Sequence, residues 1–161
     1  MKKYLFCVFI LFSLGSCQED VRFNNPSFQG LKDNVFWRAI QSQATIEANG
    51  SLVIKAYTGN EVVTLKTTST TVQTYPIGTS TSKTATYVLT DANGVLTFSS
   101  GIGIGNGQIV ITEYDSVNNT VSGTFKFNLE NVFNNPLAGA TLNFQQGVFY
   151  KVPIVVPVVA K

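Results

Sequence analysis

Val121-Ser122-Gly123-Thr124-Phe125-Lys126-Phe127-Asn128-Leu129 is the stretch that decides the fold, because its apolar and polar residues alternate. Successive side chains of a β-strand point to opposite faces, so the valine, the two phenylalanines and the leucine share one face. The serine, threonine, lysine and asparagine take the other face. We therefore predict a strand that buries one face in a core and turns the other toward water.

Gly123 stands in the apolar row of this strand. A missing side chain at that position lets a bulky neighbour such as Trp37 cross the strand, or lets the strand bend. Trp37 itself is expected to be buried.

The period of two extends from Phe36 to the C-terminal part of the chain, and turn residues interrupt it at a spacing of roughly 8 to 12 residues. Asn49-Gly50 and Asn93-Gly94 accept the positive φ of a type I′ turn, which predicts that consecutive strands pair antiparallel. The apolar segment 152–157 contains two prolines, which donate no ladder hydrogen bonds, so it is expected at a sheet edge or across a barrel mouth. We predict strands at 35–40, 44–48, 52–57, 61–67, 72–75, 84–90, 95–99, 108–114, 120–130 and 141–152.

These strands predict an all-β fold, a single antiparallel β-sandwich or meander β-barrel of about 8 to 10 strands. The pattern does not choose between sandwich and barrel.

The first sixteen residues have the order of a secretory signal: two lysines, an apolar run at 4–14 and two small residues before Cys17. The run is about half of the roughly 20 residues that a membrane-spanning helix needs. Leu14-Gly15-Ser16-Cys17 resembles the bacterial lipobox, in which the chain is cut before the cysteine and its thiol carries diacylglycerol. The resemblance implies a signal peptide at 1–16, lipidation of Cys17 and attachment to a membrane by acyl chains. An ordinary secreted protein is the alternative.

Residues 17–34 are polar and turn-rich, so we predict a lipidated flexible linker there and the β domain at 35–161. Gln18-Glu19-Asp20 resembles the surface-export signal of Bacteroidetes lipoproteins. It implies a lipid-anchored place in the outer membrane, at the periplasmic face or the cell surface.

Composition excludes several classes of function for the predicted mature part. Removal of Lys2 and Lys3 from the eleven basic residues leaves nine, against nine acids, so the mature part has no basic excess for nucleic acid. The chain has no histidine, and its other cysteine, Cys7, leaves with the signal. We therefore expect no disulfide, metal or cofactor in the folded domain.

Three sets of residues resemble an uncharacterised family of Bacteroidetes lipoproteins, the domain of unknown function 6252. They are Phe36-Trp37-Arg38-Ala39, the turn Asp115 to Asn119 with the strand Thr120 to Phe127, and Gly147-Val148-Phe149. The resemblance spans most of residues 35–152. It implies a lipoprotein address and a β fold, and it assigns no catalytic residue.

The glycine-rich segment 101–107 has the wrong spacing for a dinucleotide fingerprint and precedes a predicted strand, so a β connection is favoured over a phosphate-binding loop. Glu113 and Asp115 are the close acidic pair outside the linker, and two carboxylates could reach one cation or one sugar hydroxyl. The favoured interpretation is a solvated strand end. Asp115-Ser116-Val117 resembles a Bacteroidetes O-glycosylation acceptor, which makes Ser116 a candidate glycosylation site.

Tyr57, Tyr75 and Tyr87 are candidates for a ligand surface, since the neighbouring segment 67–86 is rich in hydroxyls and aromatic rings can stack on a ligand. Burial in the core is the alternative for these rings.

The pattern as a whole favours a membrane-anchored lipoprotein of the cell envelope with a non-enzymatic binding or structural role, its partner being a protein or an envelope component. A small-ligand or carbohydrate-binding module is the second hypothesis. An enzyme ranks last, because the usual proton-transfer residues are missing or isolated.

Overall fold

A computed structural model describes residues 26–155, and the predicted signal, Cys17 and residues 156–161 lie outside the described part. The described chain is all-β and antiparallel, which confirms the predicted fold class, and it has eleven strands. The strands are β1 (Ser27–Lys32), β2 (Val35–Arg38), β3 (Gln41–Ile46), β4 (Leu52–Tyr57), β5 (Glu61–Thr67), β6 (Thr74–Ile77), β7 (Thr84–Asp91), β8 (Gly94–Ser99), β9 (Asn106–Asp115), β10 (Thr120–Asn131) and β11 (Thr141–Pro153).

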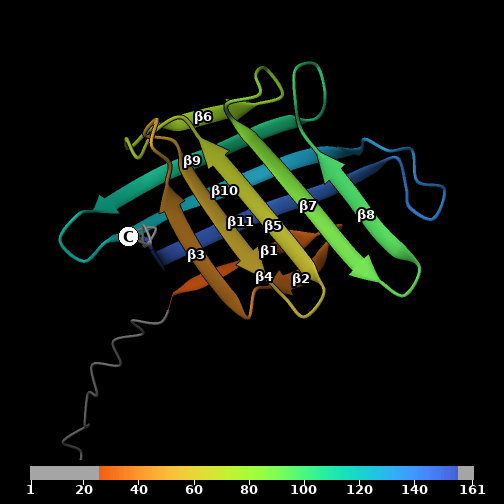
Figure 1. Cartoon of the computed structure of the whole chain (residues 1–161), viewed down its shortest axis with the longest axis horizontal. Coiled ribbons are helices and arrows are strands. Elements are labelled where there is room, and N and C mark those ends of the chain that lie inside the picture. The colour runs from red at the N-terminus through yellow and green to blue at the C-terminus, as the bar shows by residue number, and fades with distance from the viewer. Residues whose placement is uncertain (1–25, 156–161) are drawn as a thin grey trace, which may run out of the picture.

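One sheet curls into two layers (Figure 1). The first layer has the order β2-β1-β11-β10-β9-β6, and the second has the order β8-β7-β5-β4-β3. In Figure 1 the second layer lies in front, and β9, β10 and β11 cross behind it. The C-terminal end of β10 pairs with β8 through Glu130 and Asn131, and this pairing joins the layers along one side.

The opposite side is held by the end of β11. Ile154 forms a parallel bridge with Ala44 of β3, and the Val155 amide donates to the Ala44 carbonyl at 2.8 Å. The fold is therefore a barrel-like sandwich whose layers are linked at both sides. Segment 152–157 was predicted at a sheet edge or across a barrel mouth. Pro153 ends β11 and pairs with Thr120, Ile154 bridges to β3, and Pro157 lies outside the described residues.

The core between the layers is rich in aromatic rings. Phe125 stacks on Phe28 with ring centroids 4.7 Å apart, and Trp37 stands edge-on to Phe144 at 5.6 Å. Trp37 is 5% exposed, which confirms its predicted burial. The apolar row of β10 faces these rings, as the alternation predicted.

Strand β1 corrects the predicted domain boundary. Residues 27–32 were predicted to belong to the linker, but they form a strand between β11 and β2, and Phe28 of this strand is buried. The segment is polar on average and carries a single inward-facing aromatic residue, so its period of two is weak. The folded domain therefore includes residues 27–32 and does not start at residue 35.

Two further details differ from prediction. Strand β5 pairs with β7, and β6 leaves the meander to pair with β9. In the turns at Asn49-Gly50 and Asn93-Gly94 only the glycines have positive φ, 83° and 123°. These turns are therefore not type I′, which needs positive φ at both central residues.

Gly123 lies at an irregularity of register with both neighbouring strands. The close neighbour is Phe149 rather than Trp37. A Cβ atom on Gly123 would stand 2.0 Å from the Val110 carbonyl oxygen and 2.4 Å from Cζ of Phe149.

We predict that Gly123→Ala lowers the free energy of unfolding by about 1–3 kcal/mol, because backbone as well as a core ring must move. Urea unfolding followed by far-UV circular dichroism measures the change. Gly59→Ala is the matched control, since a Cβ atom there meets nothing within 4 Å. Equal effects of the two substitutions would contradict this account of Gly123.

Candidate functional site

The most organised polar cluster of the described chain surrounds the carboxylate of Glu61, which opens strand β5. Lys32 of β1, Trp37 of β2, Tyr87 of β7 and Thr58 of the preceding turn converge on it. Strands β1 and β2 belong to the first layer, and β5 and β7 to the second. The cluster therefore ties the two layers together by hydrogen bonds.

The four donors fill both oxygens of the carboxylate. Oε1 accepts from the Lys32 ammonium and from the Tyr87 hydroxyl, and Oε2 accepts from the Trp37 indole N–H and, at 3.2 Å, from the Thr58 hydroxyl. A carboxylate offers about four lone-pair positions. Because protein donors occupy them, the cluster is built as a structural tie and not as a site for a substrate.

The electrostatics of the cluster favour the ionised carboxylate. Burial alone would raise the pKa of Glu61, but the hydrogen bonds from Lys32, Tyr87 and Trp37 and the lysine charge together hold this pKa below its usual value. Burial, the hydrogen bond to Glu61 and the charges of Glu61 and Asp33 raise the pKa of Tyr87. Tyr87 therefore stays protonated and remains a donor.

The sequence analysis missed this cluster. Its five members come from three stretches of the chain, the β1–β2 hairpin, the turn before β5 and strand β7, and no sequence pattern connects these stretches. The one signal was Trp37, since a buried indole N–H requires an acceptor.

We predict that Glu61→Gln lowers the free energy of unfolding by about 2 kcal/mol, because the amide places donor hydrogens against buried donors. Urea unfolding measures the change. Glu47→Gln is the control, because Glu47 pairs with Lys66 at 2.9 Å on a more exposed surface. Its substitution is expected to cost about 0–1 kcal/mol. An equal loss of unfolding free energy in both variants would contradict a stabilising role for the hydrogen bonds to Glu61.

The lowered pKa of Glu61 also predicts a pH dependence. Stability from a carboxylate with a depressed pKa is fully present above the ordinary glutamate value of about 4.3, and is lost as the pH falls through the folded-state pKa. The difference in urea midpoint between the native chain and Glu61→Gln should stay constant above about pH 5 and narrow below about pH 4. A difference that persists undiminished at lower pH would contradict the ionised state.

The three tyrosines predicted as a ligand surface do not form one. Tyr75 and Tyr87 are each 2% exposed, and Tyr57 is half-buried. The Tyr75 hydroxyl donates to the Thr71 carbonyl at 2.8 Å, and that of Tyr87 donates to Glu61. The alternative interpretation, burial in the core, holds for Tyr75 and Tyr87 because their polar ends have protein partners.

The predicted acidic pair, Glu113 and Asp115, lies at the C-terminal end of β9, where the β9–β10 turn begins. Glu113 is exposed and accepts from the Ser122 hydroxyl at 3.3 Å. Asp115 caps its turn by accepting from the amides of Val117 and Asn118, each at 2.9 Å, and the bonds from Asn118 lower the pKa of Asp115. Among residues 26–155 no cluster of three or more metal-ligating side chains occurs.

Ser116 lies exposed in the same turn, and its glycosylation stays a prediction. The glycine-rich segment 101–107 leads into β9, as predicted for a β connection. The Gly105 amide of this segment donates to the Glu130 carboxylate at 2.9 Å, so the loop holds a protein side chain.

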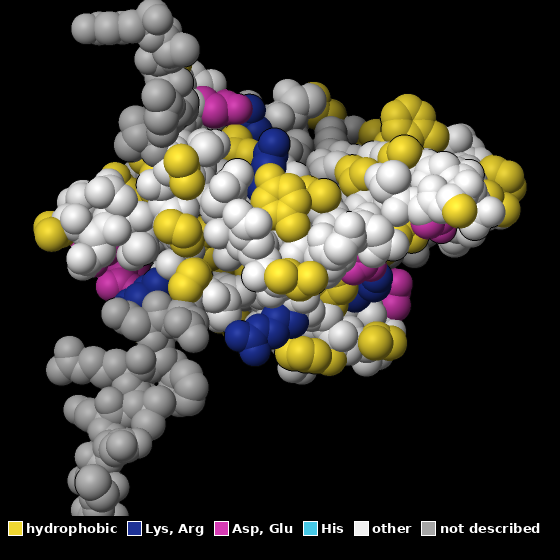
Figure 2. Space-filling view, turned by 60° about the horizontal axis from the view of Figure 1, so that its bottom comes forward, with side chains coloured by type: hydrophobic (Ala, Val, Ile, Leu, Met, Phe, Trp, Pro, Cys, Tyr) yellow, Lys and Arg dark blue, Asp and Glu magenta, His cyan; other side chains and the backbone are white. Residues whose placement is uncertain are grey.

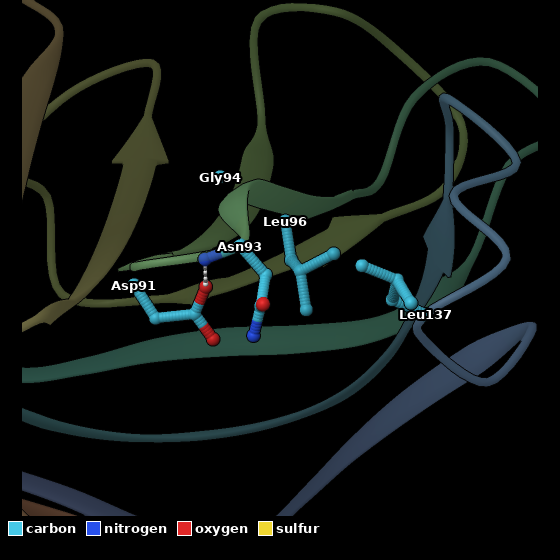
Figure 3. Close-up of a pocket in the computed structure, with 5 residues that line it drawn as sticks. All are labelled: Asp91, Asn93, Gly94, Leu96 and Leu137. Carbon is cyan, nitrogen blue, oxygen red and sulfur yellow. Dashed lines mark hydrogen bonds between the residues drawn. The ribbon is translucent and has the colours of Figure 1, made fainter.

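A small cavity of 190 Å³ lies between the β7–β8 turn and the loop that joins β10 to β11 (Figure 3). Leu96 and Leu137 face each other across it, and the Asn93 amide donates to Asp91 at 2.7 Å. Ligand pockets for drug-sized molecules usually hold about 300–1,000 Å³. The cavity is too small for that class of ligand.

Exposed apolar side chains occur around this cavity, among them Val95, Phe133 and Leu137. Figure 2 shows hydrophobic side chains at the right-hand end and elsewhere on this face, with charged groups between them. Single apolar residues on loops are common on protein surfaces and assign no function by themselves.

Comparison with known proteins places the chain in a family. The sequence profile of the domain of unknown function DUF6252 matches residues 24–153, so the chain belongs to this family. The match includes β1, in agreement with the corrected boundary. Neither the curated proteins nor the solved structures gave a match. In the part that the structure describes, no helix has the length and hydropathy to cross a membrane.

Proposed function

We propose that this protein is a lipid-anchored, non-enzymatic binding protein of the cell envelope, held in the outer membrane through Cys17. The observation that carries the proposal is Leu14-Gly15-Ser16-Cys17 directly after two lysines and an apolar run. Acyl chains contribute about 0.8 kcal/mol of membrane affinity per buried methylene, so two or three chains give stable attachment.

The short separation in sequence between Cys17 and the described fold supports this arrangement. Cys17 precedes Pro26 by nine positions, which limits the covalent reach to roughly 30 Å. Pro26 borders the β9–β10 turn and the end of β11, because it lines one surface hollow with Asn118 and Pro153. The loop from β10 to β11 lies at the far ends of the same strands, away from Pro26.

The chemistry of the described polar groups supports a role in binding rather than in catalysis. The carboxylate of Glu61 is occupied by protein donors, and Asp115 is occupied by its own turn. Such groups stabilise a scaffold, and a rigid β scaffold presents its surface to a partner.

We predict that Cys17→Ser abolishes incorporation of labelled fatty acid and moves the protein from the membrane fraction to the soluble fraction. Metabolic labelling and fractionation in a bacterial host that processes lipoproteins measure both effects. Cys7→Ser, which alters the other cysteine, is the matched control and should leave labelling unchanged. Full labelling of the Cys17 variant would overturn the anchor.

A further inference from the structure

The outward side of the first layer carries a concentration of amide side chains. They follow β9, β10 and β11 and alternate with buried apolar residues, so they share the outer side of the sheet. We call this surface the amide face, and its members are Asn106, Gln108, Asn128, Asn143, Gln145 and Gln146.

Two of these amides share a side because the strand is irregular. Consecutive residues of a regular strand face opposite ways, but the register of β11 against β10 shifts between Phe127 and Phe125. Gln146 in this bulge has a φ of 51°, which is uncommon for a residue with a side chain. As a result both Gln145 and Gln146 line the same surface hollow. Bulges that aim side chains in this way are frequent beside functional sites.

The amide face is hollowed rather than flat. One hollow of 430 Å³ is lined by Gln108, Thr124, Lys126 and the two glutamines. A second hollow of 240 Å³ adjoins it, because Lys126 and Gln145 line both. Together they form a shallow open groove, which suits a chain lying across the strands better than an enclosed small molecule.

The amides of the groove are held in place by one another. The Asn128 side chain donates to Asn106 at 3.0 Å and accepts from Asn143 at 2.5 Å. A carboxamide has two donor hydrogens and two acceptor lone pairs, so these bonds use part of its capacity. The donors and acceptors that these bonds leave over can form hydrogen bonds with hydroxyl groups of a ligand.

An exposed aromatic ring stands at one end of the same row of residues. Gln145 pairs with Leu31 of β1, and Leu31 pairs with Phe36 of β2, which is 63% exposed. Four strand spacings separate Gln108 from Phe36, which gives about 19 Å. A ring at this distance can stack on the apolar face of a sugar several units along a bound chain.

The charges of the groove point to an uncharged ligand. Lys126 is the charged residue among the described side chains that line the two hollows. On the same side of the sheet Glu113 and Glu130 lie on either side of the two hollows along the direction of β10, by the register of β10 with β9 and β8. A polyanion lying across the strands would pass between these two carboxylates and meet a single lysine in the hollows, whereas Lys126 can donate to a hydroxyl of a neutral chain.

From these observations we propose that the amide face, with Lys126 and Phe36, binds a neutral oligosaccharide chain. The proposal rests on the proposed binding role, for which it supplies the site and the ligand class. The amides and Lys126 bind hydroxyls, and Phe36 covers one sugar face.

Isothermal titration of the full-length protein in detergent with neutral hexasaccharides tests the site, the probes being the hexaoses of the malto, cello, xylo and manno series. We expect at least one of them to bind. Lys126→Ala and Phe36→Ala should each weaken that binding tenfold or more. Lys55→Ala is the matched control, because Lys55 is an exposed lysine in the middle of β4 on the other layer. It should bind as the native protein does.

Three results would overturn the proposal: no binding of any neutral hexasaccharide, binding that survives both groove substitutions, or tighter binding of hexagalacturonate than of the neutral probes. Unfolding midpoints of the variants, expected to be unchanged at these exposed positions, separate loss of the site from loss of the fold. Fatty-acid labelling of Cys17 is independent of the titration. Failure of glycan binding with labelling intact would therefore refute the site and leave the anchor standing.

Discussion

Burial of the apolar row of β10 is the constraint on which the rest of the structure depends. Phe125, Phe127 and Leu129 project from one side of a strand, and a single sheet cannot cover them. The chain covers them by curling the sheet, so that β10 pairs with β9 along most of its length and with β8 at its end. Gly123 and Gly147 allow the rings of Phe149 and Phe125 to lie against the backbone of the neighbouring strand. The aromatic core and the curvature therefore have the same cause.

When two layers close over an aromatic core, the polar atoms of its aromatic residues at the rim still need hydrogen-bond partners. Trp37 and Tyr87 contribute large apolar surfaces to the core, but each also brings a hydrogen that needs an acceptor. Glu61 supplies that acceptor for both, and Lys32 compensates its charge. A carboxylate with one partner removed would be costly, so the members of the cluster depend on one another. The tie also fixes β2, a four-residue edge strand, against the second layer.

The sequence predicted what depends on local periodicity and missed what depends on distant contacts. Strands such as Leu52–Tyr57 were predicted to the residue, because their alternation is strong. Strand β1 was missed because Phe28 is its one buried aromatic residue, and the pairing of β5 with β7 was missed because no local pattern records a skipped strand. The tyrosines were misassigned in part because exposure follows from the layer that covers a ring. The Glu61 cluster unites residues that only the closed fold brings together.

Different physical requirements determine the residues on the two sides of the first layer, and this difference bears on function. Inward residues are fixed by packing, so Phe127 and Leu129 are explained by the core they fill. Outward residues in water need only be polar, and lysine, glutamate or threonine would serve equally well. This surface instead carries six amides, a bulge that turns two glutamines the same way and an exposed phenylalanine in the same row. Folding does not require these features. The left-handed Gln146 adds a conformational cost without contributing to the core. Features of a surface that folding does not explain are best explained by what the surface binds, and hydrogen-bonding amides beside an aromatic ring match the chemistry of a sugar chain.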